Sequence, residues 1–388
     1  MRSLFILLIS IWAVPVFSQT AAELFERAKK ETDLSTQIEL LSQVIEKSPQ
    51  HVGAYHYRAD AYQASGDTHR AMQDYNRVIA LRPKDPFRYY ARGLAYQRLG
   101  ESSLALADFS KAISLRPNYE NFYLARARAY QMLGKYSQAL ADYHQYVDGI
   151  WSSASVKLLH EMIPVSLEAY RYEVAQEQLD ALTHKGDDSF ERYLWQGRLW
   201  QSEDKLDEAI SAFSKAVNRA PKQAEPYQLR ANAFKEQGDY PAALEDYTWV
   251  LKLAPSAYWF NRRGLTYEEL KDFEHAQDDY NRAVELDPKW AVAYNNRGFA
   301  RLHLKDYAAA KQDFETAINL DPSAPTPYVN LAGLYWTWKK DRKNMYKNLE
   351  KAVNYHFKNY ESLFNDDQKG WMFKGVNNTA EFRSILYK

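Results

Sequence analysis

The sequence contains no cysteine at any of its 388 positions. Without thiols the chain cannot form disulfides, bind zinc through cysteine, hold an iron–sulfur cluster, use a thiol nucleophile or carry a lipid on cysteine. Packing and polar contacts must therefore hold the fold together.

Glycine and proline are also scarce, with 14 of each. Both residue types interrupt helices, so their scarcity favours a mostly helical chain. Hydrophobic residues make up 46% and charged residues 26%, a composition typical of folded, soluble proteins. Basic and acidic side chains number 50 each. A chain without net charge lacks the positive field that collects phosphates, so we expect no nucleic-acid partner.

The apolar run at the start of the chain, from Leu4 to Phe17, is too short to span a bilayer, which takes about 20 residues. A basic residue precedes the run and the small residue Ser18 follows it. This arrangement is typical of a secretory signal peptide, which we predict for residues 1–18. The alternative is an uncleaved anchor. We expect an exported protein, periplasmic or secreted, with no integral membrane span in its mature part.

Motifs of catalysis are missing as well. The sequence has no phosphate-binding glycine loop, HExxH helix, GxSxG elbow or EF-hand loop. Its nine histidines form no two-ligand pair with an acidic third residue at helical spacing. We therefore expect no metal, no cofactor and no enzymatic activity, although a hydrolase that uses two carboxylates leaves no sequence motif to exclude it.

What the sequence does contain is a period of about 34 residues. Prolines recur at 34-residue spacing, with one interval of 33 and one gap of about three periods: Pro49, Pro83, Pro117, Pro221, Pro255, Pro288 and Pro322. Each block has an aromatic residue at its fourth place, Ala or Gly at the eighth, Ala at the twentieth and an aromatic again at the twenty-fourth, as in Tyr89, Gly93, Ala105 and Phe109. Spacings of three and four place these residues on one face of each of two helices, where small residues let the helix axes approach.

These residues resemble the tetratricopeptide repeat (TPR), a helix–turn–helix unit. The resemblance implies an all-α fold, an alpha-alpha superhelix (TPR solenoid) of about ten repeats with a C-terminal helical cap. The expected organisation is a signal peptide (1–18), a degenerate first repeat (19–51), a three-repeat array (52–151), a degenerate repeat or a bend (152–189), a four-repeat array (190–322), a degenerate last repeat (323–357) and a cap (358–388).

Arginine at the seventh place accompanies aspartate at the twenty-third place in six blocks, always sixteen residues apart. The block that begins at Phe190 has Gln196 and Ala212 there, so both charges are lost together. We predict that each arginine pairs with the aspartate of its own or the adjoining repeat and fixes the register. The alternative is two separately solvated surface charges. The candidate pairs are Arg58 with Asp74, Arg92 with Asp108, Arg126 with Asp142, Arg230 with Asp246, Arg263 with Asp279, and Arg297 with Asp313.

The resemblance also implies a working surface, the concave groove lined by the first helices. Carried over to this sequence, its partner-binding positions are Asn232, Asn261, Arg262, Asn295, Asn296, Phe299, Asn330 and Trp336, with His56, Asp60, Tyr90, Arg98 and Arg128 in the first array. Asparagine amides suit sequence-tolerant contacts with a peptide backbone. The Lys and Asn pattern with which one variant of the family binds a C-terminal carboxylate is absent.

We therefore expect a non-enzymatic TPR scaffold or adaptor that mediates protein–protein interaction in the cell envelope or the secreted space. An extended peptide or a partner helix would bind in the groove. The alternative is a carbohydrate-binding module that stacks sugars on Tyr90, Phe299 and Trp336. Self-association through the end repeats is a third possibility.

Overall fold

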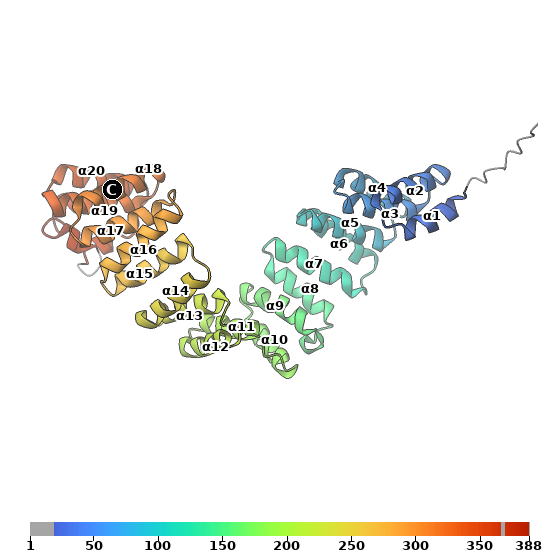
Figure 1. The fold of residues 1–388 in the computed structure, drawn as a ribbon, viewed down its shortest axis with the longest axis horizontal. Helices are drawn as coiled ribbons and strands as arrows, with labels where there is room; N and C mark the ends of the chain where they lie inside the picture. The colour runs from blue at the N-terminus through green and yellow to red at the C-terminus, as the bar shows by residue number, and fades with distance from the viewer. Residues whose placement is uncertain (1–18, 366–368, 388) are drawn as a thin grey trace, which may run out of the picture. The chain divides into compact units, whose positions relative to one another are not determined.

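The computed structural model of the chain describes residues 19–365 and 369–387, so the predicted signal peptide lies outside the described residues. Within these ranges every regular element is helical, in twenty-one α-helices and three short 3-10 helices (Figure 1). This confirms the prediction of an all-α repeat fold.

Twenty of the helices form ten successive pairs. In chain order the pairs are α1 (Ala21–Lys30) with α2 (Leu34–Lys47), α3 (Val52–Ala64) with α4 (Thr68–Leu81), α5 (Pro86–Arg98) with α6 (Ser102–Leu115), α7 (Glu120–Met132) with α8 (Tyr136–Tyr146), α9 (Val156–Glu168) with α10 (Tyr172–His184), α11 (Phe190–Ser202) with α12 (Leu206–Arg219), α13 (Ala224–Gln237) with α14 (Tyr240–Leu253), α15 (Ala257–Glu269) with α16 (Phe273–Leu286), α17 (Ala291–His303) with α18 (Tyr307–Leu320), and α19 (Pro325–Lys339) with α20 (Arg342–Asn354).

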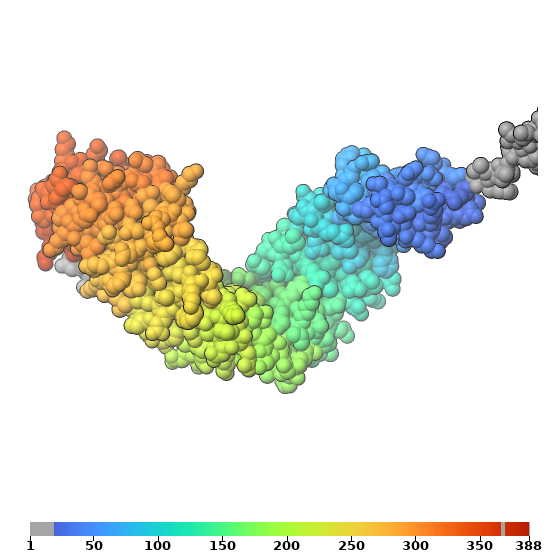
Figure 2. Space-filling view, viewed as in Figure 1, coloured from blue at the N-terminus to red at the C-terminus, as the bar shows by residue number. Residues whose placement is uncertain are grey.

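The chain divides into two compact units at Ala181 and Leu182, inside α10. We call them the N-terminal and the C-terminal unit. The boundary falls in the segment 152–189, where the sequence predicts a bend or an eroded repeat. That segment contains the short helix η1 (Trp151–Ser153) followed by the pair α9 and α10, and α9 continues through Pro164. Within each unit the chain proceeds from one helix pair to the next without interleaving, as the colour order in Figure 2 shows, so its contacts are mostly local.

The turn inside a repeat has a recurring local structure. Aspartate caps the second helix in six repeats by accepting a backbone N–H from the third residue onward, for example Asp239 from Ala242 and Asp272 from His275. A residue with positive φ precedes or lies near the cap in nine turns: Gly66, Gly100, Gly134, Tyr170, Asp204, Gly238, Lys271, Lys305 and Lys340. Non-glycine residues in this conformation cost about 1–2 kcal/mol each, which the surrounding helix packing must offset.

The small residue at the eighth place lets the two helices of a repeat touch. A Cβ atom added to Gly264 of α15 would lie 2.6 Å from the ring of Tyr280 on α16. At Gly197 the same atom would lie 2.4 Å from Phe213. The aromatic residue at the twenty-fourth place thus packs directly on the backbone of the first helix, and Tyr280 and Phe213 are fully buried.

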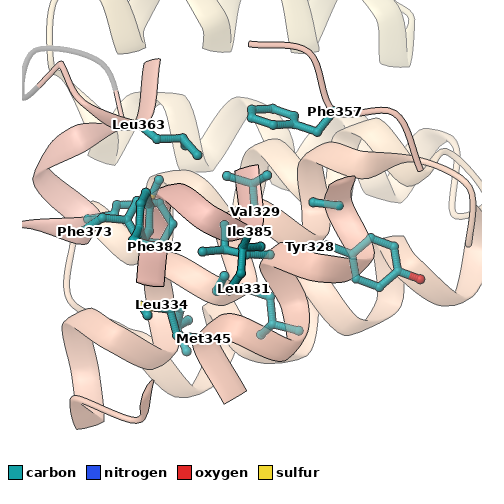
Figure 3. Packing of buried hydrophobic residues seen from close by; sticks show 14 of the residues in the cluster. Tyr328, Val329, Leu331, Leu334, Met345, Phe357, Leu363, Phe373, Phe382 and Ile385 are labelled. Carbon is teal, nitrogen blue, oxygen red and sulfur yellow. The ribbon is translucent and has the colours of Figure 1, made fainter. Parts of the chain in front are cut away.

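A compact cap closes the C-terminal unit. It consists of η2 (Glu361–Leu363), η3 (Gly370–Phe373) and α21 (Ala380–Leu386). Phe373 and Phe382 lie against each other with ring centroids 5.3 Å apart, and both are fully buried beside residues of α19 and α20 (Figure 3). Each such side chain stabilises the fold by about 1.5–3 kcal/mol, so the cap is a firmly attached part of this unit.

Candidate functional site

The predicted arginine and aspartate partners lie within the same repeat in all six cases. Each guanidinium donates through Nε and Nη2 to the two carboxylate oxygens, as in Arg126 and Asp142 at 2.7 and 2.8 Å. Two parallel hydrogen bonds fix the relative position of both side chains, and with them the register of the two helices. The other pairs with this bidentate geometry are Arg58 with Asp74, Arg92 with Asp108, Arg230 with Asp246, Arg263 with Asp279, and Arg297 with Asp313.

Burial of the aspartates contradicts the alternative that these residues are separately solvated surface charges. Asp74 and Asp108 are only 5% exposed, and Asp313 is 2% exposed. Asp313 also accepts a hydrogen bond from a second arginine, Arg301, at 2.7 Å. A buried carboxylate whose oxygens are already bonded offers nothing to a binding partner. Asp74, Asp108 and Asp313 are therefore structural residues of their repeats and do not belong to an accessible site.

The same holds for Asp142, Asp246 and Asp279, which are 3–5% exposed. Burial raises the pKa of Asp246 and of Asp279, and the hydrogen bonds from the paired arginine act against that rise. Each buried carboxylate therefore depends on its arginine to remain charged inside the repeat.

Each arginine also has a second partner that sequence analysis missed. The remaining nitrogen, Nη1, donates to a side-chain oxygen on the second helix of the preceding repeat, for example from Arg230 to Ser214 at 3.0 Å. A guanidinium therefore joins two neighbouring repeats. A column of Ser, Thr or Asn fifteen or sixteen residues before each arginine carries the signal: Ser42, Asn76, Ser110, Ser214, Thr248 and Asn281.

We call the surface formed by the first helices of successive pairs the inner face of a unit. In the N-terminal unit it carries a charged cluster on α7 and α9. Arg128 donates to both carboxylate oxygens of Glu161, at 2.6 and 2.9 Å, and the Tyr143 hydroxyl donates to Glu161 at 2.8 Å. The hydrogen bonds from Arg128 and Tyr143 lower the pKa of Glu161 against the opposing effect of burial.

The other candidates of this unit are also bonded internally. Arg98 donates to Gln63 at 2.6 Å, and the Tyr75 hydroxyl donates to Asp60. Burial lowers the pKa of His56, which faces Asp60 across 3.7 Å. Arg98 thus contacts the preceding repeat, Tyr75 bonds across its own helix pair, and His56 and Asp60 lie on the same helix, α3.

A hollow of about 490 Å³ lies beside this charged cluster. Its lining comes from α7, the start of α8, and α9, and consists of Arg128, Gln131, Met132, Tyr136, Pro164, Val165 and Glu168. Met132 is 56% exposed although it is a large apolar side chain. The inner face of the N-terminal unit therefore offers an apolar recess with a cationic and an anionic group at its edge.

In the C-terminal unit four of the predicted asparagines form one continuous chain of hydrogen bonds. Asn330 donates to Asn295 at 2.9 Å, Asn295 to Asn296 at 3.2 Å, and Asn296 to Asn261 at 2.9 Å. Asn261, Asn295 and Asn330 are at most 8% exposed. The structure thus brings these residues together across α15, α17 and α19, but three of them lie below the surface and bond to one another.

The series of hydrogen-bonded amides starts from Lys369 of the cap, which is its first donor. Its ammonium group donates to Asn330 at 2.6 Å and lies 5.2 Å from the centroid of the Phe299 ring. Burial lowers the pKa of Lys369 to about 8 against the opposing charge of Glu268. Burial raises the pKa of Glu268 to about 7 and lowers that of His303 to about 4. The cap therefore closes the inner face over α17 and α19.

Each of the three aromatic residues proposed for sugar stacking contacts neighbours within its own unit. Tyr90 packs on Phe109 and Phe122, with centroids 5.8 and 5.1 Å away. Phe299 lies between Lys369 and His303, and Trp336 donates from its ring to the carbonyl of Lys374 at 3.0 Å. The rings of Tyr90 and Phe299 are thus engaged by neighbouring side chains, and the indole N–H of Trp336 is engaged by the cap.

Asn232 and Arg262, the remaining two candidates, lie together on α13 and α15. Arg262 donates to Asn232 at 3.0 Å, and the Tyr247 hydroxyl donates to the same oxygen at 2.7 Å. Lys369 itself was not foreseen, because residues 358–388 lack the repeat and their place in the fold has no periodic signal.

Over residues 19–365 and 369–387, no three His, Asp or Glu side chains gather in a way that could hold a metal ion. None of the helices in the same ranges has both the length and the apolar character needed to cross a bilayer.

Comparison with known proteins agrees with the repeat. Three family models, each described as tetratricopeptide repeat, match residues 59–128, 165–224, 257–289 and 291–324. Human Tetratricopeptide repeat protein 6 is 30% identical over 94 residues, which are 24% of this chain and 18% of that protein. Hsp70-Hsp90 organizing protein 3 of Arabidopsis thaliana is 30% identical over 88 residues, 22% of this chain and 16% of that protein. The chain thus matches less than a fifth of the length of these relatives.

Solved structures give a likeness of fold alone. MamA from Desulfovibrio magneticus RS-1, residues 41 to the end, has a TM-score of 0.41 and 20% identity, covering 44% of this chain and 96% of that one. YrrB, described as a TPR protein with an unusual peptide-binding site, has a TM-score of 0.39 and 21% identity, covering 46% of this chain and 91% of that one.

Proposed function

Because the chain belongs to the tetratricopeptide repeat family, a scaffold type suited to protein–protein interaction, we propose that it binds an extended segment or a helix of a partner protein on the inner face of its N-terminal unit. The hollow around Met132 carries this proposal. It combines a half-exposed apolar side chain with Arg128 and Glu168 at its edge, and it lies between first helices of neighbouring repeats. An apolar anchor residue of the partner would enter it, and polar groups beside it would bond the backbone.

The C-terminal unit supports this choice of surface. Its inner face over α17 and α19 is covered by Lys369 and by Trp371, whose ring centroid lies 4.5 Å from that of His303. A partner cannot lie along these repeats without displacing the cap, which is held by fully buried apolar side chains. The N-terminal unit carries no comparable cover among the described residues.

The test is a photo-crosslinking side chain placed at Met132 in the full chain. We expect it to capture a specific protein from the envelope or medium of the source cells. The control is the same side chain at Leu104 of α6, a second helix, which is 47% exposed. Equal capture from both positions would contradict the proposal, because it would mean that contact does not depend on the inner face.

We further propose that the protein acts outside the cytoplasm, after removal of residues 1–18. The first described helix begins at Ala21, with Thr20 as its N-cap and Glu23 completing a capping box. Cleavage before Gln19 or Thr20 would leave that cap in place. N-terminal sequencing of the protein from fractionated cells tests this: an intact Met1 on protein recovered from the cytoplasm would refute it.

No enzymatic activity is proposed, since the family and the fold are those of a non-catalytic scaffold. The carbohydrate alternative receives no support from the positions of Tyr90, Phe299 and Trp336, because each of these rings already has a neighbour in the fold. Self-association through the end repeats stays a prediction to be tested by light scattering.

A further inference from the structure

The turn between α19 and α20 is strongly basic in a chain that carries no net charge. Residues 335–347 contain five basic side chains and one acidic side chain, whereas the whole chain has 50 of each kind. The corresponding segment of the pair α13 and α14, residues 233–245, contains one basic and three acidic side chains, so the repeat itself does not require the positive charge. The basic residues of the segment, all of them exposed, are Lys339, Lys340, Arg342, Lys343 and Lys347.

The fold does not neutralise this charge with acidic partners. Within residues 19–365 and 369–387, the ion pairs include none of the five basic residues. Asp341, the acid of the segment, caps α20 by accepting the backbone N–H of Asn344 at 3.0 Å. Glu381 of α21 interacts with Tyr346 and borders the basic residues on that side. The ammonium groups of the turn thus remain available to an anionic partner.

Two tryptophan rings lie among these cations. The Lys339 ammonium group is 4.1 Å from the centroid of the Trp338 ring, and the Lys340 ammonium group is 4.7 Å from that of Trp336. Trp338 is 37% exposed, and its ring stacks on Tyr307 with centroids 5.9 Å apart. Contacts between cations and ring faces keep the ammonium groups beside the indoles. We call this surface the basic aromatic patch; it consists of Trp336, Trp338, Lys339, Lys340, Arg342 and Lys343.

The backbone of the turn is already hydrogen bonded. The N–H groups of Lys340 and Asp341 donate to the carbonyls of Trp336 and Tyr335 at 3.1 and 3.2 Å, and that of Arg342 donates to Lys340 at 3.1 Å. A peptide that binds in an extended form pairs with free backbone groups of its receptor. The patch presents side chains instead, namely several positive charges and an exposed indole ring.

We infer that the basic aromatic patch binds the surface of an anionic phospholipid bilayer. Lysine and arginine near such a surface are attracted by its negative potential. Tryptophan is favoured at the level of the headgroups, because its ring is apolar and carries one polar N–H. An acidic protein segment would satisfy the charges of Lys339 and Lys343 but offers no apolar layer for the ring of Trp338. The contact is peripheral and independent of the proposed partner site at Met132.

The test is flotation of the full chain with vesicles made of equal parts phosphatidylglycerol and phosphatidylcholine. We expect binding to be at least about tenfold tighter than to vesicles of phosphatidylcholine alone. Raising the salt concentration from about 0.1 M to about 1 M should weaken it, because salt screens exposed charges. All variants share one N-terminus, so the apolar run from Leu4 to Phe17 cannot cause a difference among them.

The decisive variant combines Lys339→Gln with Lys343→Gln. Each basic residue near an anionic surface strengthens binding about fivefold, so we expect the double change to weaken binding to the mixed vesicles at least about tenfold, without loss of helix content. The matched control combines Lys215→Gln with Lys252→Gln. Both of these lysines are exposed and lie beside an aromatic ring, that of Tyr193 or that of Trp249, outside the patch.

A second pair of variants tests the indole ring. We expect Trp338→Ala to weaken binding to the mixed vesicles at least about fivefold, because the loss of apolar area adds to electrostatic attraction. Trp249→Ala, at a tryptophan that is 44% exposed and also carries a lysine over its ring, should leave binding unchanged.

Equal binding to both kinds of vesicle would overturn the inference, as would equal binding by wild type and the variant with Lys339→Gln and Lys343→Gln. A labelled oligoglutamate peptide provides the remaining distinction. If it binds the patch more tightly than the mixed vesicles do, and Trp338→Ala has no effect on vesicle binding, the patch serves an acidic protein segment and the bilayer is refuted.

Discussion

The ammonium group of Lys369 donates a hydrogen bond to Asn330 over 2.6 Å and so links the cap to the inner face of the last repeats. Burying an ammonium group costs desolvation free energy, so this contact adds little to stability and much to the orientation of the amides that follow. An apolar side chain of similar volume would serve a purely structural cap equally well.

Substitution of Lys369 should separate these roles. We expect Lys369→Met to change the melting temperature of the C-terminal unit little, because the lost hydrogen bond to Asn330 and the removed desolvation cost nearly cancel. Lys369→Glu should destabilise this unit by about 3 kcal/mol or more, since a carboxylate would face Glu268 and the oxygen of Asn330. The exposed neighbour Lys374 provides the control substitution Lys374→Glu. A large loss of stability in Lys369→Met would show that the ammonium group is needed for folding.

The pKa of Glu268 predicts a pH dependence. Its folded-state pKa of about 7 lies above the ordinary value of 4.5, so the folded chain holds this proton more tightly than the unfolded chain does. The stability that Glu268 contributes therefore falls as pH rises from about 4.5 to about 7, by up to about 3 kcal/mol. Between these pH values Glu268→Gln should gain stability relative to wild type by that amount.

Hydrogen exchange of α15 amides at the two pH values measures this difference locally, which avoids assuming that a repeat protein unfolds in one step. Glu269→Gln, at the exposed neighbouring position, should follow the wild-type pH dependence. Parallel pH profiles of wild type and Glu268→Gln would contradict the prediction.

The arginine and aspartate pairs should show energetic coupling. In a double-mutant cycle of Arg126→Ala and Asp142→Ala, we expect a coupling free energy of about 1–3 kcal/mol, because Asp142 is buried and would lose two hydrogen bonds. The same cycle on the exposed pair Arg282 and Glu285 should give less than about 0.5 kcal/mol. Urea denaturation provides the measurement, and additive effects within about 0.3 kcal/mol at Arg126 and Asp142 would disprove the coupling.

Replacement of Gly264 by alanine should destabilise the repeat by about 1–3 kcal/mol, since the new Cβ atom would lie 2.6 Å from the ring of Tyr280. The double variant Gly264→Ala with Tyr280→Leu should cost less than the sum of the two single changes, because the smaller side chain leaves room for the methyl group. Thermal unfolding of the four proteins tests this. Strict additivity would mean that Gly264 is required for another reason.

The helix pairs were predictable because each depends on residues close in sequence. Tyr280 reaches Gly264, and Asp279 reaches Arg263, from the adjacent helix of the same repeat. Sixteen residues always separate the charged partners, so a 34-residue period in the sequence already contains their geometry. The column of Ser, Thr and Asn residues that includes Ser214 is present in the sequence too. Such polar residues are common on helix surfaces, however, and no single residue type recurs at this place.

The sequence alone determined the repeat, the pairing of its helices and the positions that line their contacts, because these interactions are local and recur in phase. The tertiary structure decided which residues of the inner face are covered and which hydrogen bonds they form. Residues 358–388 have no period, so only folding could place Lys369 beside Asn330 and Glu268. That contact fixes the direction of the hydrogen bonds that join four of the predicted asparagines, three of which are buried. When a side chain comes from a distant segment without a repeat, the periodic pattern of the residues that it contacts does not predict that contact.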